Sequence, residues 1–430
     1  MLLRIPLVEY QGCKYTDLPI PEGVSNPLLD SGFVDGLEHF LQKNKLDKVL
    51  SFGRKGIKAS SYVGVIKYKN IQFEILPKLS SKNEDDNQIL KNLFYMLSFT
   101  KKLNVKNNKS ASLSACSNPF LEILIGAFAE GLFDALKRCA PKGYIVRSEN
   151  VKYLKGRLNL PSHIKYNSFN QSRFFCDYDE FSENNVLNQL FLYVATCLYS
   201  VCRTQQNKKL LKLIINFYSD VDFVCFDNKD LSVIKLSRAQ SGFEMPLKLA
   251  KMFVEKTSVD MSAHKFENIA LIWDMNFLFE EFVAEFLKRY KQDLDIKYIS
   301  CQHSRKLLIS EENDRGYAST YVDVFLVMNN GKKLVLDTKY KNNQGQFGEF
   351  SNADVFQVTT YCRLHDCHNA ILLYPAADKN KNDEHSYRLN VDTGIEELHV
   401  KTSRIYIMDD LQKETEQLKA RFRQILTVAN

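Results

Sequence analysis

Alternation of apolar and polar positions marks a β-hairpin in the last third of the chain. The stretch 321–341 has the sequence YVDVFLVMNNGKKLVLDTKYK, in which the apolar runs 321–328 and 333–336 flank Asn329-Asn330-Gly331. Asparagine and glycine tolerate the positive φ angle that a tight turn needs. The pattern therefore predicts two antiparallel strands joined at this turn. The sequence YVGVIKYKNIQFEILPK at 62–78 predicts a second hairpin around Lys69-Asn70 for the same reason.

Apolar residues spaced by three and four positions predict helices over much of the remaining chain. The expected helices are 33–41, 90–97, 119–139, 183–202, 207–218, 246–254, 266–290, 354–364 and 411–425. Further strands are expected at 4–10, at 144–160 folded back around Glu149-Asn150, at 297–299, 306–309, 370–374 and within 396–408. Ser182 is the expected cap of the helix that follows it. The result is an α+β protein with a β-rich region 1–85, a mainly helical region 86–265 with a hairpin, and an α/β region 266–430.

Composition places the chain among globular proteins of two or three domains. It has 430 residues, 45% hydrophobic and 25% charged, with a net charge of +7 from 58 basic and 51 acidic residues. This mild excess of positive charge is compatible with nucleic acid as a partner. Ten cysteines without a regular framework indicate reduced thiols. The apolar run 120–133 contains Glu122 and Glu130, so we expect a buried helix there, no membrane partner and a cytoplasmic protein.

Each arm of the 321–341 hairpin carries an acid. Asp323 interrupts the first apolar run, and Asp337 ends the second, with Lys339 on the same face of the strand two residues later. An uncompensated charge in apolar surroundings costs roughly 3–5 kcal/mol, so such groups are paired or bind metal. Carboxylate oxygens suit Mg²⁺, and a lysine beside them can orient a water and offset charge on a phosphate. The alternative is a surface hairpin with a solvated Asp–Lys pair.

This acid and D-x-K pattern resembles the signature of the PD-(D/E)xK nucleases. The expected order of helix, strands, hairpin, helix and strand over 266–375 is similar to the core of that superfamily. A glutamate of the first helix would then face the strands, and helical periodicity leaves Glu280 and Glu281 both open. Gln357 and Tyr361 are four residues apart on the next helix and resemble the Q-x-x-x-Y element of RecB-like nucleases.

Taken together, the motifs resemble the McrC family, the nuclease subunit of McrBC-like and LlaJI-like modification-dependent restriction systems. The stretches that carry the resemblance are YVGVIKYKNIQFEILPK, MNFLFEEFVAEFL, YVDVFLVMNNGKKLVLDTKYK, DVFQVTTYCRLHDCHNAILLYP and DEFSENNVLNQLF. The resemblance implies a catalytic set of Asp323, Asp337, Lys339 and Glu280 beside Gln357 and Tyr361. It also implies Mg²⁺ or Mn²⁺ held by Asp323, Asp337, Glu280 and the backbone carbonyl of Thr338. Val322 stands where the superfamily pattern has proline.

The resemblance implies partners as well. McrC-like subunits associate with a McrB-like AAA+ GTPase that recognises and translocates double-stranded DNA, so residues 1–265 would face this partner. The sequence G-x-x-x-x-G-K-[ST] is absent from the chain, so we expect no nucleotide hydrolysis by the chain itself. Arg157 beside Gly156 is a candidate for a contact with the GTPase, as an arginine finger makes.

Two other functions fit the same residues. A RecB-like nuclease of repair or phage defence that acts alone would cut DNA without GTP or a ring partner. A non-catalytic activator docked on a GTPase ring would stimulate GTP hydrolysis and would show no metal-dependent cutting.

Overall fold

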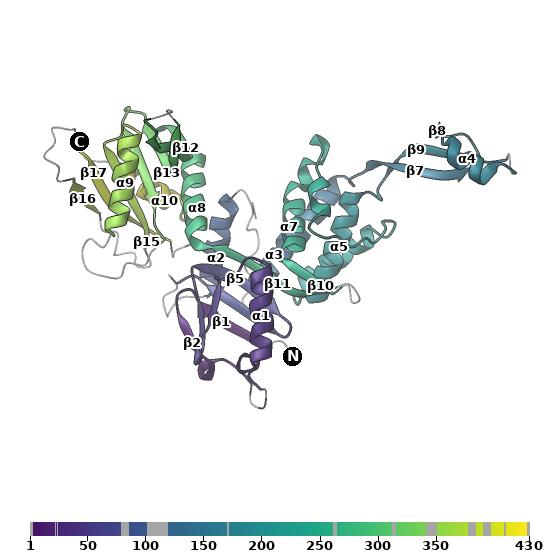
Figure 1. Ribbon diagram of the computed structural model, residues 1–430, viewed down its shortest axis with the longest axis horizontal. Helices are drawn as coiled ribbons and strands as arrows, with labels where there is room; N and C mark the ends of the chain where they lie inside the picture. Colours follow the sequence, from purple (N-terminus) through teal and green to yellow (C-terminus); the bar gives the residue numbers. More distant parts are fainter. Residues whose placement is uncertain are drawn as a thin grey trace. The chain divides into compact units, whose positions relative to one another are not determined.

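The computed structural model shows a protein of mixed helices and sheets (Figure 1), which confirms the expected α+β class. It describes residues 3–21, 23, 25–78, 86–100, 119–169, 172–260, 265–311, 315–340, 351–376, 384–389, 397–407 and 410–427. The chain folds into two compact units, one made of Met1–Ser114 with Leu271–Asn430 and the other of Ala115–Ala270. No helix in the described ranges has the length and apolarity needed to span a bilayer. The partner-facing role of residues 1–265 stays a prediction.

The first unit begins with a sheet in the order β1, β6, β5, β11. Its strands are β1 (Leu3–Val8), β5 (Tyr62–Tyr68), β6 (Ile71–Leu76) and the end of β11 (Lys265–Asp274). The predicted hairpin is confirmed, because β5 and β6 pair antiparallel with Tyr68 opposite Ile71. Helix α1 (Ser31–Lys43) packs on it through Phe33 and Phe40, whose rings lie 5.4 and 5.6 Å from that of Tyr68. Strands β2 (Gly12–Lys14), β3 (Leu50–Phe52) and β4 (Gly56–Ala59) form a small separate sheet.

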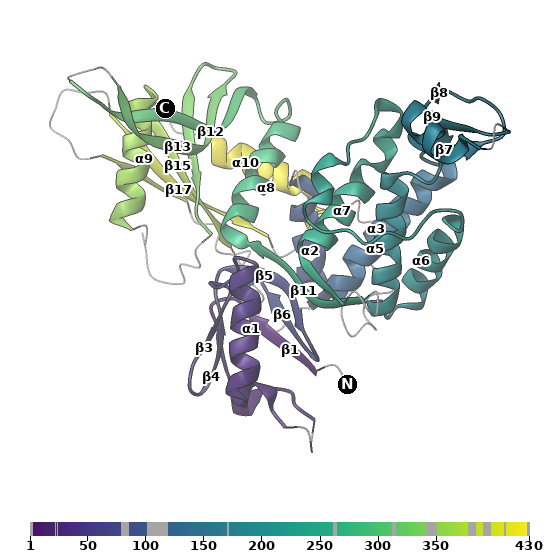
Figure 2. The same cartoon turned by 45° about the vertical axis from the view of Figure 1, so that its right-hand side comes forward.

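The same unit holds a second sheet in the order β12, β13, β14, β15, β17, β16. Its strands are β12 (Ile296–Ile309), β13 (Gly316–Met328), β14 (Lys333–Thr338), β15 (Asn369–Ala376), β16 (His385–Arg388) and β17 (His399–Tyr406). The predicted 321–341 hairpin is confirmed, with Gly331 at φ +86° and Val327 opposite Lys333. Helices α2 (Asp86–Phe99), α8 (Met275–Arg289), α9 (Asn352–Leu364) and α10 (Thr415–Leu426) accompany this sheet (Figures 1 and 2). Stacking of Phe286 on Phe422, 5.1 Å apart, joins α8 to α10.

Some of the predicted boundaries in this unit are wrong. The helix expected from Phe266 begins only at Met275, because residues 265–274 form strand β11. The signal for the true start is Asp274, whose Oδ1 accepts a hydrogen bond from the N–H of Asn276 at 2.9 Å as an N-cap. The two short strands expected at 297–299 and 306–309 are one continuous strand, β12. The strand expected at 370–374 is longer, since β15 includes Pro375, which lies opposite Ile405.

The second unit is a group of helices with a β-sheet arm. The helices are α3 (Pro119–Arg138), α5 (Val186–Val201), α6 (Gln205–Phe217) and α7 (Glu244–Glu255), and strand β10 (Thr257–Asp260) pairs with the start of β11. The arm, residues 143–182, consists of β7 (Gly143–Val151), β8 (Arg157–Leu158), α4 (Leu160–Asn167) and β9 (Phe174–Ser182) (Figure 1). The expected turn at Glu149-Asn150 is wrong, because β7 runs through both residues. Asn185, not Ser182, caps α5, and its Oδ1 accepts from the N–H of Asn188 at 3.1 Å.

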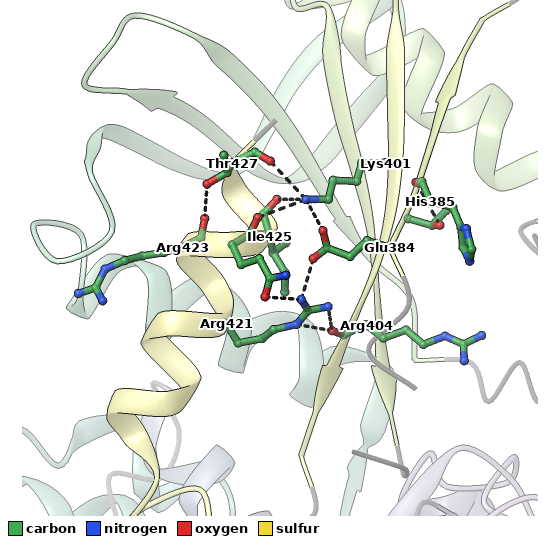
Figure 3. Close-up of polar contacts among 10 residues, drawn as sticks. Glu384, His385, Lys401, Arg404, Arg421, Arg423, Ile425 and Thr427 are labelled. Atoms are coloured by element: carbon green, nitrogen blue, oxygen red, sulfur yellow. Dashed lines mark hydrogen bonds and ion pairs between the residues drawn. The ribbon is translucent and has the colours of Figure 1, made fainter. Parts of the chain in front are cut away.

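The C-terminal end of α10 is fixed by a buried lysine (Figure 3). Lys401 of β17 donates from Nζ to the carbonyl oxygens of Gln424, Ile425 and Thr427 at 3.1–3.3 Å. The carbonyls of the last helical turn lack the full set of partners that helix interiors have, and a cation near a helix C-terminus also offsets its dipole. Glu384 neutralises Lys401 at 2.8 Å, and its other oxygen lies 2.7 Å from Arg421. The helix is thereby held against the far strands of the sheet.

A buried polar contact joins the N-terminal sheet to the chain just beyond β14. Lys78 donates from Nζ to the carbonyl oxygen of Tyr340 at 3.2 Å, and the Tyr340 hydroxyl donates to Oε2 of Glu9 at 3.3 Å. The Lys78 ammonium also lies 4.6 Å from the centroid of the Tyr340 ring and 3.9 Å from Oε1 of Glu9. Burial is the largest influence on Glu9 and raises the pKa of its carboxyl to about 8, although Lys78 opposes this. Residues more than 260 positions apart in sequence are thus tied together.

The raised pKa of Glu9 predicts how stability depends on pH. The folded state holds this proton up to about pH 8, whereas the unfolded state releases it near 4.5. Between these values the folded state binds more protons, so the free energy of unfolding should fall by about 1.4 kcal/mol per pH unit from this group. The Glu9→Gln variant should lose this slope. Urea unfolding from pH 5 to 8 measures it, with Glu38→Gln on the exposed face of α1 as the control that keeps the wild-type slope. Equal slopes for all three proteins would contradict the assignment.

Candidate active site

Two carboxylates meet on neighbouring strands, Asp323 in the middle of β13 and Asp337 near the end of β14. The pairing of Val324 with Leu336 sets Asp323 of β13 across from Asp337 of β14. Oδ2 of Asp323 accepts hydrogen bonds from the N–H and the hydroxyl of Thr338, at 2.9 and 3.0 Å. The side chain of Asp337 is fully buried, so water does not solvate its charge. Its compensation comes from an ion pair with a lysine.

Lys339 connects the acids to helix α9. Its ammonium lies 2.7 Å from Oδ2 of Asp337 and 3.9 Å from Oδ1 of Asp354. It also donates to Oε1 of Gln357 at 3.0 Å, while the amide of Gln357 donates to the hydroxyl of Tyr361 at 2.7 Å. The backbone N–H of Lys339 is held by the carbonyl oxygen of Leu373 on β15 at 2.9 Å. The structure therefore brings the Gln–Tyr pair and the D-x-K pair into one hydrogen-bonded chain.

Glu280 of α8 approaches the acids from the neighbouring helix, which contacts β13 and β14. Asp323 and Asp337 both act on its carboxyl group electrostatically. Gln302 of β12 donates a hydrogen bond from Nε2 to Oε1 of Glu280. The carboxyl group of Glu280 therefore interacts electrostatically with the charges of the site.

Burial and mutual repulsion dominate the electrostatics of the site. Burial, followed by repulsion from Asp323, raises the pKa of Asp337 to about 7. The same causes in the same order raise the pKa of Glu280 to about 7. Burial also raises the pKa of Asp323, against the opposing effect of its bonds from Thr338. For Lys339 burial lowers the pKa, but the surrounding carboxylates outweigh it and the pKa lies above its ordinary value. The site thus lacks positive charge, which a cation would supply.

The donor set fits a hard divalent cation that completes its coordination elsewhere. Asp337 offers a buried carboxylate whose charged partner is the Lys339 ammonium, and Asp323 faces it from the next strand. In the described part of the chain, no three His, Cys, Asp or Glu side chains converge as a ready-made ligand set. Mg²⁺ is commonly held by only one or two carboxylates, with water and substrate phosphate as the other ligands. The carbonyl of Thr338 and the carboxylate of Glu280 stay predicted ligands.

Several contacts at the site were missed from the sequence. Asp354, 5% exposed, lies near Lys339, and the Thr338 side chain orients Asp323. A signal for Asp354 existed, because Ser351 and Asp354 form a capping box that starts α9. Gln302 carried no signal, because its role depends on strand pairing. Arg157 lies in the arm of the second unit, at the start of β8 opposite Asp177, and belongs to a separate feature.

Comparisons with known proteins agree with this architecture. A family model described as McrBC 5-methylcytosine restriction system component matches residues 57–375, well over half of the chain. The search of curated proteins found no match.

Solved structures share the fold. The chain is similar to one in the refined half-complex from a tetradecameric assembly of Thermococcus gammatolerans McrB AAA+ hexamers with bound McrC. The TM-score is 0.72 at 20% identity, covering 98% of this chain and 99% of that chain. A chain in the cryo-EM structure of the Thermococcus gammatolerans McrBC complex matches with a TM-score of 0.54 at 22% identity, covering 67% of this chain and 88% of that chain.

Proposed function

The chain belongs to the family of McrBC 5-methylcytosine restriction system components, and on that basis we propose that it is the nuclease subunit of such a system. It hydrolyses phosphodiester bonds of double-stranded DNA with Mg²⁺ or Mn²⁺, as a domain of the PD-(D/E)xK class. The observation that carries this proposal is the buried Asp337 carboxylate, set across from Asp323 with the Lys339 ammonium at 2.7 Å. A fold alone would not require this costly arrangement.

The residues of the site divide the work. Asp323 and Asp337 hold the cation, with the carbonyl of Thr338 and Glu280 as further ligands. When bound, the cation supplies positive charge to the scissile phosphate and acidifies the attacking water. Contacts with Asp337 and Gln357 hold the Lys339 ammonium beside the two acids. From there it stabilises the negative charge that develops on the phosphate in the transition state. Tyr361 holds Gln357 in turn, so the Q-x-x-x-Y pair orients Lys339.

We further propose that an AAA+ GTPase resembling McrB is the partner, with DNA recognition and translocation in that subunit. The support is family membership and the arm of the second unit. The arm exposes an unusual number of large apolar side chains, namely Tyr144, Val146, Tyr153, Leu154, Leu160, Ile164, Tyr166, Phe169 and Phe181. Exposed apolar side chains gathered on one small element are typical of a site of protein–protein interaction.

Arg157 follows a turn of the arm that only glycine can form. Gly156 has φ +67°, and a Cβ there would lie 2.5 Å from the carbonyl oxygen of Asp177, so only glycine fits the turn. The turn presents the exposed Arg157 from the arm. A guanidinium at such a position can reach a phosphate of a neighbouring subunit.

Removal of the acid–lysine set should abolish cutting. Asp337→Ala and Lys339→Met should each lower the cleavage rate by roughly 10²–10⁴-fold, because ligand charge and charge stabilisation are lost. Glu280→Ala should also slow cleavage, whereas Glu281→Ala, one residue along the helix, should leave the rate near that of wild type. The assay is cutting of methylated DNA by the purified subunit with its GTPase, GTP and Mg²⁺.

Three results would count against this proposal. Unchanged cutting by Asp337→Ala would exclude the catalytic set. Stimulated GTP hydrolysis with no metal-dependent cutting by wild type would show a docking activator instead. Efficient cutting without GTP or the ring would favour a nuclease that acts alone.

Substitution of Arg157 should affect GTP hydrolysis by the partner and not the chemistry of DNA cleavage. Arg157→Ala should lower subunit-stimulated GTP hydrolysis by at least about tenfold, because a trans-acting guanidinium stabilises the charge of phosphoryl transfer. Lys142→Ala removes the same charge at the base of the arm and should preserve stimulation. GTP turnover at saturating subunit measures both. Stimulation by Arg157→Ala equal to that of wild type would exclude the contact.

A further inference from the structure

The backbone of β12 has an unusual conformation beside the acids. Gln302 has φ +51°, in the left-handed region that non-glycine residues rarely adopt, although it lies inside a long strand. The strand pairing on either side of it is regular, with Cys301 opposite Val324 and His303 opposite Val322. Such a local distortion is costly and persists where the surroundings require it, most often at functional sites.

The register places Gln302 in line with the acids. Because Cys301 and His303 pair with Val324 and Val322, Gln302 lies across from Asp323. Asp323 in turn lies across from Asp337 on the next strand. A glutamine therefore extends the row of acids by one strand, at the edge of the sheet where β12 has β13 as its neighbour.

The side chain of Gln302 connects this strand to α8. Its Nε2 donates to Oε1 of Glu280, whose carboxyl also interacts with the charges of Asp323 and Asp337. An amide donor is suited to this place, because it can hold a carboxylate close to two others without adding charge. Neither helical periodicity nor a motif points to this residue.

We propose that Gln302 is a positioning residue that holds the Glu280 carboxylate toward the Asp323 strand, and that its left-handed backbone is what aims the amide at Glu280. The inference rests on the proposed function for its effect on cutting, but the contact itself can be tested apart from any activity. Gln302 acts through Glu280 and does not itself touch the reacting atoms.

A double-mutant cycle tests whether the two residues act together. Gln302→Met keeps the length of the side chain but removes the amide donor, and Glu280→Ala removes the acceptor. Gln302→Met should slow single-turnover cutting at saturating DNA by about tenfold, with the DNA KM within about twofold of wild type. The double variant should be no slower than Glu280→Ala, because the amide has no role once the carboxylate is gone. Losses that multiply, or a Gln302→Met rate equal to wild type, would overturn the proposal.

A stability measurement in EDTA on wild type, the two single variants and the double variant tests this inference independently of the proposed function. Thermal unfolding without metal, GTP or DNA should show coupled shifts in midpoint for residues 280 and 302. Coupling in a protein that does not cut DNA would refute the nuclease assignment and retain the contact. Additive shifts would overturn the contact even if wild type cuts.

Glycine variants isolate the backbone from the side chain. Ala318 of β13 has φ +49° in the same pair of strands, so Ala318→Gly should raise the unfolding midpoint and leave cutting unchanged. Gln302→Gly relieves the same backbone conformation and should still cut as slowly as Gln302→Met. Wild-type cutting by Gln302→Gly would show that the amide is dispensable and would overturn the proposal.

Discussion

Two carboxylates are buried on adjacent strands, and the other contacts of the site compensate for the cost of burying them. Asp337 has no exposed surface and faces Asp323, so repulsion adds to the loss of hydration. The protein compensates with the Lys339 ammonium and with the donors of Thr338, while Glu280 adds a third acid from α8. A bound cation would relieve the repulsion among these carboxylates, and the same cation is the one that the proposed hydrolysis requires.

The surrounding fold keeps this arrangement in place from several directions. Helix α9 supplies Gln357 to Lys339, and helix α8 supplies Glu280. Beyond Lys339 the chain is held by the contact of Lys78 with Tyr340, so the N-terminal sheet borders the site-bearing strand. The arm with Arg157 belongs to the other unit. The proposed chemistry of cutting and the proposed partner contact are thus carried by different parts of the chain.

Local sequence signals were enough to predict the hairpins, because the turns Asn329-Asn330-Gly331 and Lys69-Asn70 lie between clearly apolar runs. The pairing expected for the 321–341 hairpin was also enough to predict that Asp323, Asp337 and Lys339 lie close together. The helix expected at Phe266 was wrong because buried strand residues can also have helical spacing, and the cap at Asp274 was overlooked. Gln302 and the Lys78–Tyr340 contact could not be predicted, because they depend on pairing between distant segments.

The most direct test of the account is the affinity of the purified chain for Mn²⁺, measured by electron paramagnetic resonance without partner, nucleotide or DNA. Asp337→Asn keeps the shape of the side chain and removes its charge. The account predicts that wild type binds the ion and that the Asn variant binds it at least about tenfold more weakly. Equal affinity in the two proteins would contradict a cation site between the two strands.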